Sequence, residues 1–141
     1  MTDSNSPPAA NQPWKDLLTQ AFSARAYSYS PYSKYKVGAA LLTKSGKVYT
    51  GCNIENVGYS ATVCAERTAI FKAISEGETE FEAIAVATEN GGLPCGICRQ
   101  VIREFASELT IIVGDIEGRY QVFTLSDLLP YSFGPEDLIS S

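Results

Sequence analysis

Hydrophobic residues along the chain recur at helical spacing in several segments. Pro13 can open a first helix that continues to about residue 22. In segment 64–75, apolar residues lie three and four positions apart, and Gly77 follows where a helix stop belongs. Segment 95–107 repeats this spacing, and 125–129 has the pattern of a final short helix. The pattern therefore predicts four helices.

Shorter apolar segments between these helices have the length and composition of β-strands. The first two flank Ser45-Gly46, which is a hairpin signal. The third is a continuous apolar run, typical of a strand that is buried on both faces. Because strands and helices are interleaved, we expect an α/β fold, a three-layer α-β-α sandwich whose central mixed sheet has about five strands. The strands are predicted at 37–43, 47–53, 83–87, 110–113 and 120–123.

The length of 141 residues is typical of one domain. The first dozen residues are rich in Ser, Pro and Asn, so we predict a disordered tail over 1–12 and a single domain over 13–141. This tail lacks the basic and apolar parts of a signal peptide, and no apolar run approaches the roughly 20 residues of a membrane span. We therefore expect a cytoplasmic protein that does not bind membranes.

Acidic residues outnumber basic ones by 16 to 11, which gives a net charge of -5. The basic residues are scattered, as at Lys34, Lys36, Arg99 and Arg103. A protein that follows a phosphate backbone needs a stripe of basic residues. We therefore expect no nucleic-acid partner and predict a small, neutral substrate.

Two cysteine motifs carry the candidate chemistry, in a chain that has no histidine. The first motif is Cys64-x-Glu66, and the second is Cys95-x-x-Cys98, which follows a proline. Three thiolates can hold one Zn²⁺ and leave its fourth position open, as in catalytic zinc sites. Glu66 is then available to move protons. The alternative is a closed structural site with Cys52 as the fourth ligand, which would leave Glu66 without a role.

The charge of such a centre needs compensation, because three thiolates outweigh one Zn²⁺ and a bound hydroxide would add a further negative charge. Cys64 and Cys95 fall at predicted helix N-termini, whose positive potential stabilises thiolates. Arg67 and Arg99 are the cations that the sequence places closest. We predict that Arg67 donates hydrogen bonds to the cysteine sulfurs, the alternative being that it lies on a solvated helix face.

Several further motifs accompany the cysteines. A Cys-x-Glu followed by Pro-Cys-x-x-Cys is a signature of zinc-dependent deaminases. From about residue 31 to residue 138 the chain resembles the cytidine deaminase family of the small, zinc-dependent, homotetrameric type. The matching motifs are Pro31-Tyr32-Ser33, Val37-Gly38-Ala39-Ala40-Leu41, Gly51-Cys52-Asn53-Ile54-Glu55-Asn56, Cys64-Ala65-Glu66-Arg67, Pro94-Cys95-Gly96-Ile97-Cys98-Arg99-Gln100, Leu128-Leu129-Pro130 and Ser132-Phe133-Gly134-Pro135-Glu136-Asp137-Leu138.

The resemblance implies a reaction and the residues that perform it. Cys64, Cys95 and Cys98 would bind one zinc ion per chain, Glu66 would be the proton shuttle, and the Ala65 backbone N–H would meet O2 of the pyrimidine. The implied reaction is hydrolytic deamination of cytidine and 2′-deoxycytidine to uridine and 2′-deoxyuridine, with release of ammonia, in pyrimidine salvage. Deamination of another aminopyrimidine nucleoside and a non-catalytic structural zinc module are the alternatives.

The resemblance also implies contacts to the rest of the substrate. Asn53 and Glu55 match positions that hydrogen-bond the ribose hydroxyls. Tyr35 stands where relatives often have a phenylalanine that packs on the base. Tyr59 and Phe133 match positions that approach the active site of a neighbouring subunit. The implied enzyme is a homotetramer with shared active sites, and its other partner is the small-molecule nucleoside.

Overall fold

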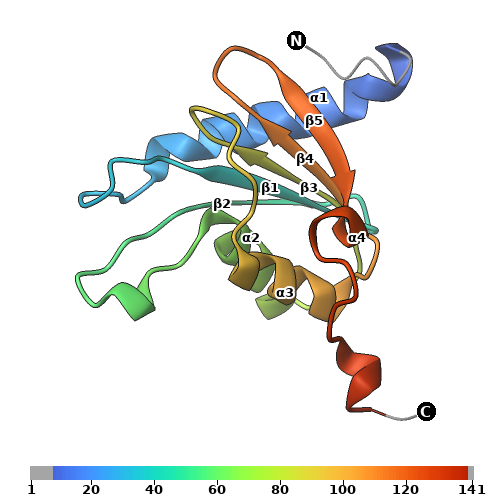
Figure 1. The fold of residues 1–141 in the computed structure, drawn as a ribbon. Helices are drawn as coiled ribbons and strands as arrows, with labels where there is room; N and C mark the ends of the chain where they lie inside the picture. The colour runs from blue at the N-terminus through green and yellow to red at the C-terminus, as the bar shows by residue number, and fades with distance from the viewer. Residues whose placement is uncertain (1–7, 140–141) are drawn as a thin grey trace.

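The structure, a computed structural model, describes residues 8–139 and is built around one five-stranded sheet (Figure 1). Its strands are β1 (Gly38–Thr43), β2 (Val48–Cys52), β3 (Phe81–Ala87), β4 (Thr110–Gly114) and β5 (Tyr120–Thr124). They lie in the order β2-β1-β3-β4-β5. Only β3 and β4 run parallel, and the other neighbours are antiparallel. The sheet is therefore mixed, as predicted.

Helices cover both faces of this sheet, which confirms the predicted three-layer arrangement (Figure 1). One long helix packs on one face, and two helices that lie next to each other pack on the other. In chain order the helices are α1 (Pro8–Ala24), α2 (Ala65–Ser75), α3 (Gly96–Phe105) and the short α4 (Leu125–Leu128), with single 3-10 turns η1 (Arg25–Tyr27), η2 (Tyr59–Ala61) and η3 (Pro135–Asp137). α1 is the helix that stands alone on its face.

Successive side chains of each strand point to opposite faces of the sheet and so supply two separate cores. In β1, Leu41 packs with α2 and α3, whereas Ala40 packs with α1. In β3, Ile84 packs with α2 and α3, whereas Ala85 packs with α1. Segment 83–87 is apolar throughout because helices bury the strand from both sides.

Glycines in β1 and β2 let the helices approach the sheet closely. A Cβ atom at Gly38 would lie 1.9 Å from the Ala21 carbonyl oxygen of α1. A Cβ atom at Gly51 would lie 2.6 Å from the Ala69 nitrogen of α2. Both contacts are shorter than van der Waals separations, so only glycine permits these packing distances. The close packing of α2 on β2 fixes the position of its N-terminus and therefore of Cys64.

The first helix is longer than the sequence pattern predicts. α1 begins at Pro8 instead of Pro13, so it includes residues 8–12 of the segment that was expected to form the tail. The disordered tail over 1–12 stays a prediction, and its residues 1–7 lie outside the described residues. Pro8 suits the first turn of a helix, where its missing N–H leaves no bond unmade, and the alanines that follow have the highest helix propensity.

The other elements agree with the predicted segments to within a few residues at their ends. β1 and β2 form the predicted hairpin, and Gly46 in its turn adopts a φ of 94°, which glycine accommodates without strain. Cys95 caps α3 instead of belonging to it. Within residues 8–139, no helix is long and apolar enough to cross a membrane.

Candidate active site

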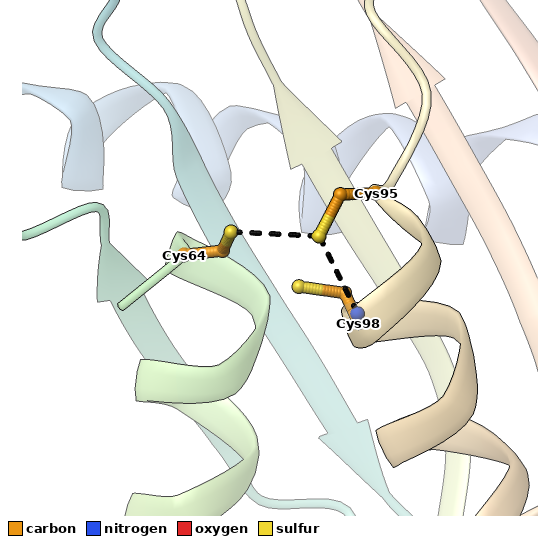
Figure 2. A group of neighbouring side chains, drawn as sticks. All are labelled: Cys64, Cys95 and Cys98. Carbon is orange, nitrogen blue, oxygen red and sulfur yellow. Dashed lines mark hydrogen bonds between the residues drawn. The ribbon is translucent and has the colours of Figure 1, made fainter. Parts of the chain in front are cut away.

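Three cysteine sulfurs converge where the N-termini of α2 and α3 lie close together (Figure 2). Cys64 is the N-cap residue of α2, Cys95 is the N-cap residue of α3, and Cys98 lies on the first turn of α3. Their Sγ atoms lie within 4.8 Å of one another. The Cys98 backbone N–H donates to Cys95 Sγ at 3.4 Å. The structure therefore brings the three predicted ligands together.

The separation of these sulfurs fits one zinc ion. Zn–S bonds of about 2.3 Å at tetrahedral angles place two sulfurs about 3.8 Å apart. The Sγ atoms of Cys64 and Cys95 are 3.7 Å apart. Cys52 lies at the end of β2, and the group of metal-ligating side chains found among residues 8–139 does not include it. The described residues therefore offer three thiols to one metal ion, which would leave a fourth coordination position open.

The surroundings of the thiols favour a thiolate at Cys64. A hydrogen bond from Cys98 and a further one from Arg67 lower the pKa of Cys64 to about 5. The same hydrogen bond, together with burial, raises the pKa of Cys98, because Cys98 must keep its proton to donate that bond to Cys64. A bound divalent cation replaces that proton, since coordination deprotonates thiols.

Arg67, on the first turn of α2, supplies positive charge at the sulfurs. Its Nη2 atom donates to Cys64 Sγ at 3.4 Å. Arg99, the other cation that the sequence places nearby, donates instead to the carbonyl oxygens of Pro94 and Leu128, each at 2.7 Å. Of the two predicted cations, Arg67 is thus the one with a hydrogen bond to a cysteine sulfur.

Replacement of Arg67 by Ala is expected to weaken zinc binding roughly 10- to 100-fold, because it removes the charged donor to Cys64. Competition for the metal against a chelator measures this affinity directly. Arg119→Ala is a matched control, because Arg119 pairs with Asp115 at the β4–β5 turn. An Arg67→Ala protein that binds zinc as tightly as the wild type would show that the Nη2–Sγ contact does not stabilise the metal centre.

A cavity of about 450 Å³ opens beside the sulfurs. Glu66 lines this cavity and is 4% exposed. Burial raises the pKa of its carboxyl group to about 7. A carboxyl group with a pKa near neutrality can both accept and release a proton at pH 7. The other predicted site residues that line the cavity are Tyr35, Asn53, Glu55, Cys64, Ala65 and Cys95.

Asn53, which follows β2, is buried and connects the sheet to the loop over residues 28–37. Its Oδ1 atom accepts hydrogen bonds from the Val37 N–H at 3.0 Å and from the Ser28 hydroxyl. Its Nδ2 atom donates to the Tyr35 carbonyl oxygen at 2.7 Å. These bonds use one of the two Nδ2 hydrogens. Asn53 therefore positions this loop, a role that the sequence did not predict.

Glu55 is bound by the same loop. Its Oε1 atom accepts hydrogen bonds from the N–H groups of Tyr32 at 2.9 Å and Ser33 at 3.1 Å, and its Oε2 atom accepts one from the Ser33 hydroxyl. The bond from the Ser33 hydroxyl is the main reason why the pKa of Glu55 lies below its ordinary value. Ser33 was not predicted as a site residue, although it belongs to the Pro31-Tyr32-Ser33 motif.

Two predicted residues lie outside this cavity. Tyr59, in η2, is 80% exposed and lines an adjacent cavity of about 460 Å³, which shares Ser33, Glu55 and Thr62 with the first. Phe133 is 59% exposed, and its carbonyl oxygen accepts a hydrogen bond from Gln100 at 2.9 Å. Neither aromatic side chain lines the first cavity of its own chain.

Comparison with known proteins extends this description. Residues 12–114 match a family model described as the cytidine and deoxycytidylate deaminase zinc-binding region. A protein of Sporosarcina psychrophila named cytidine deaminase is 48% identical over 125 residues, which cover 86% of this chain and 92% of that protein. Both cysteine motifs lie within this zinc-binding region, and the three thiols lie close enough together to hold one metal ion.

Solved structures share the fold. The crystal structure of cytidine deaminase from Burkholderia pseudomallei superposes with a TM-score of 0.81 at 46% identity and covers 84% of this chain and 97% of that one. The crystal structure of cytidine deaminase from Mycobacterium tuberculosis superposes with a TM-score of 0.76 at 40% identity and covers 86% and 97% of the two chains. The chain therefore belongs to the cytidine and deoxycytidylate deaminase family.

Proposed function

We propose that this protein hydrolyses the exocyclic amino group of cytidine and 2′-deoxycytidine, which gives uridine and 2′-deoxyuridine and releases ammonia. The observation that carries this proposal is that the buried carboxyl group of Glu66 lines the same cavity as the thiols of Cys64 and Cys95. The cavity has a volume of about 450 Å³, which is typical of small-molecule sites. Relatives named cytidine deaminase, 41% to 48% identical to this chain, support the same activity.

The residues of the chain divide the chemistry between them. Cys64, Cys95 and Cys98 would hold the zinc ion, which would act as a Lewis acid and lower the pKa of a water molecule towards about 7. Glu66 would accept a proton from that water as its oxygen adds to C4 of the pyrimidine, and would pass this proton to N3. Glu66 would then take a second proton from the hydroxyl group now on C4 and deliver it to the amino group. The C4–N bond would break as the C4 carbonyl forms, and ammonia would leave.

Other residues of the cavity would hold the substrate in place. Glu55 is a carboxylate with hydrogen bonds to the loop, and it can accept a further bond from a ribose hydroxyl. The second Nδ2 hydrogen of Asn53 can donate to a neighbouring ribose oxygen. The Ala65 N–H, at the start of α2, would meet O2 of the pyrimidine, because the first amides of a helix have no partner within the helix.

Cytidine is expected to react with a kcat/KM roughly 100-fold or more above that of free cytosine, because without the sugar the groups that bind it stay unpaired. Ammonia release by the purified zinc-loaded protein measures both rates. Cytosine turnover at a rate near that of cytidine would show that the sugar contacts do not matter. No turnover of either compound by protein with bound zinc would favour another aminopyrimidine nucleoside or a structural zinc module.

The sugar contacts can be isolated with one substitution. Glu55→Gln should lower kcat/KM for cytidine and leave the slow turnover of cytosine unchanged, because only the nucleoside has hydroxyls for this carboxylate. Glu117→Gln, at the exposed β4–β5 turn, is a matched control that removes the same charge far from the cavity. Equal losses for cytidine and cytosine in Glu55→Gln would assign Glu55 to holding the loop alone.

We also propose that the working enzyme is a cytoplasmic homotetramer of pyrimidine salvage whose active sites are completed across subunit boundaries. Tyr59 and Phe133 support this proposal, because both are large aromatic side chains that lie mostly exposed on one chain. Exposed aromatic residues of this kind are common at interfaces between proteins. Tyr59 also lines a cavity that adjoins the substrate cavity, where a neighbouring chain could reach the sugar.

Mixed oligomers of Glu66→Gln and Phe133→Ala subunits are expected to be more active than the mean of the two parent proteins. If sites are shared, some sites of the hybrid carry neither substitution. Subunits are mixed by co-expression, and ammonia release is measured at equal zinc content. Mixing Glu66→Gln with Cys98→Ala is the control, because both changes affect the same chain's site and should give no gain. A fully active monomer by light scattering would contradict shared sites.

A further inference from the structure

The hydroxyl group of Tyr35 occupies a defined place at the wall of the substrate cavity. Its oxygen donates a hydrogen bond to Asn90 Oδ1 at 2.7 Å. A Cβ atom at Gly92 would lie only 2.6 Å from this oxygen, but 3.8 Å from the Cζ atom of the ring. The hydroxyl therefore fills the space that a side chain at position 92 would need. An aromatic ring without the hydroxyl would leave that space free.

The loop that carries Asn90 and Gly92 is held in place by contacts that do not involve the tyrosine. Thr88 is buried, and its Oγ1 atom accepts hydrogen bonds from the N–H groups of Gly91 at 2.8 Å and Gly92 at 2.9 Å. Asn90 also forms a β-bridge with Asp115, where β4 leads into the turn before β5. The partners of the hydroxyl are therefore fixed to the sheet.

Tyr35 is also fixed at its backbone. Its carbonyl oxygen accepts the hydrogen bond from Asn53 Nδ2 at 2.7 Å. Tyr35 is therefore held through its backbone by Asn53, which follows β2, and through its hydroxyl by Asn90. Tyr35 and Gly92 both line the substrate cavity. A displacement of the ring therefore changes the shape of the space in which a pyrimidine nucleoside would lie.

We propose that Tyr35, Asn90 and Gly92 form a positioning set, in which Gly92 leaves room for the phenol hydroxyl and Asn90 binds it, so that the aromatic wall of the nucleoside cavity is held in one place. This inference rests on the proposed function for its effect on the substrate. The set also accounts for a tyrosine at a position where the family resemblance leads us to expect a phenylalanine. A phenylalanine would need neither the acceptor at Asn90 nor the absence of a side chain at Gly92.

The decisive test places Gly92→Ala in two backgrounds. In the otherwise wild-type protein it should raise KM for cytidine roughly tenfold, with a smaller effect on kcat, because the methyl group forces the ring out of place. In the Tyr35→Phe background the same change should alter KM less than about twofold, because a separation of 3.8 Å from the ring is an ordinary van der Waals contact. A similar change of KM in both backgrounds would overturn the inference.

The hydrogen bond is tested with a double-mutant cycle. Asn90→Ala and Tyr35→Phe should each raise KM for cytidine roughly two- to tenfold, and the double variant should be no worse than either single one. Tyr27→Phe is the control for loss of a phenol hydroxyl, because Tyr27 is 83% exposed and lies outside the cavity. Additive losses in the double variant would mean that the two side chains act separately.

Thermal unfolding separates this inference from the proposed function, because it needs no substrate. Gly92→Ala should lower the melting temperature in the wild-type background and not in the Tyr35→Phe background. Gly96→Ala, where an added methyl group meets no atom within 4 Å, should not lower it. If the protein fails to deaminate cytidine and this melting pattern still appears, the positioning set is supported and the proposed substrate is wrong. Equal losses of melting temperature in both backgrounds would overturn the positioning set itself.

Discussion

Replacement of Glu66 by Gln is expected to lower kcat for cytidine roughly 10²- to 10⁴-fold, with fold and zinc content unchanged. The amide has the size of the carboxyl group but cannot accept a proton from water or pass one to the pyrimidine. Glu55, the other carboxylate that lines the cavity, is bound by the Tyr32 and Ser33 N–H groups and the Ser33 hydroxyl. It is therefore not free to take over the proton transfers.

Steady-state kinetics together with the zinc content of each preparation measure this effect. Glu82→Gln is a matched control, because Glu82 is an exposed carboxylate on β3 that does not line the substrate cavity, and this variant should keep the wild-type rate. A Glu66→Gln protein with one zinc ion per chain that retains more than about a tenth of the wild-type kcat would exclude the proton-shuttle role.

The sequence predicted the three cysteines as candidate zinc ligands, and for two of them the geometry is local. Cys95 and Cys98 are three residues apart at the start of a helix, where that spacing places two side chains on one face. Cys64 is separated from them by a whole strand, and no local rule brings it close. Its position follows from α2 and α3 packing next to each other on one face of the sheet. The motif therefore predicted the residues, and the fold determined their distances.

The two candidate arginines show where sequence proximity is not sufficient. Arg67 and Arg99 each lie within three residues of a candidate zinc ligand, yet of the two only Arg67 donates to a sulfur. Arg99 instead reaches the Leu128 carbonyl oxygen, 29 positions away in sequence, and so binds the segment after α4 to α3. The direction of each side chain depends on tertiary contacts, which the sequence distance to a cysteine does not predict.

The loop contacts of Asn53 were beyond sequence reasoning for a different reason. Family resemblance assigned this residue to the sugar, but three of its hydrogen bonds bind residues 28–37 to the sheet. Such bonds depend on the path of an irregular loop, and the residues between Tyr27 and Lys36 have no periodic pattern that predicts it. The hydrogen bond from the Tyr35 hydroxyl to Asn90 was not predicted either, because Asn90 lies 55 positions away in sequence.

Replacement of Cys98 by Ala is expected to abolish both zinc retention and cytidine turnover. Each thiolate contributes a large share of the roughly 10–16 kcal/mol with which thiolate and imidazole sites of zinc-finger peptides bind zinc, and two sulfurs leave the ion poorly held. Cys98 is buried, and alanine offers no atom that could take the place of its sulfur. Zinc content after dialysis and ammonia release from cytidine measure the two losses.

Cys52→Ala is the control that separates the open site from a closed one. Cys52 lies at the end of β2 and outside the group of three sulfurs, so this variant should keep one zinc ion per chain and wild-type activity. X-ray absorption should show three sulfur neighbours and one lighter atom around the zinc in both the wild type and Cys52→Ala. Four sulfur neighbours in the wild type, with loss of zinc in Cys52→Ala, would establish a closed structural site. Without an open position there could be no activated water, and Glu66 would have no proton to accept.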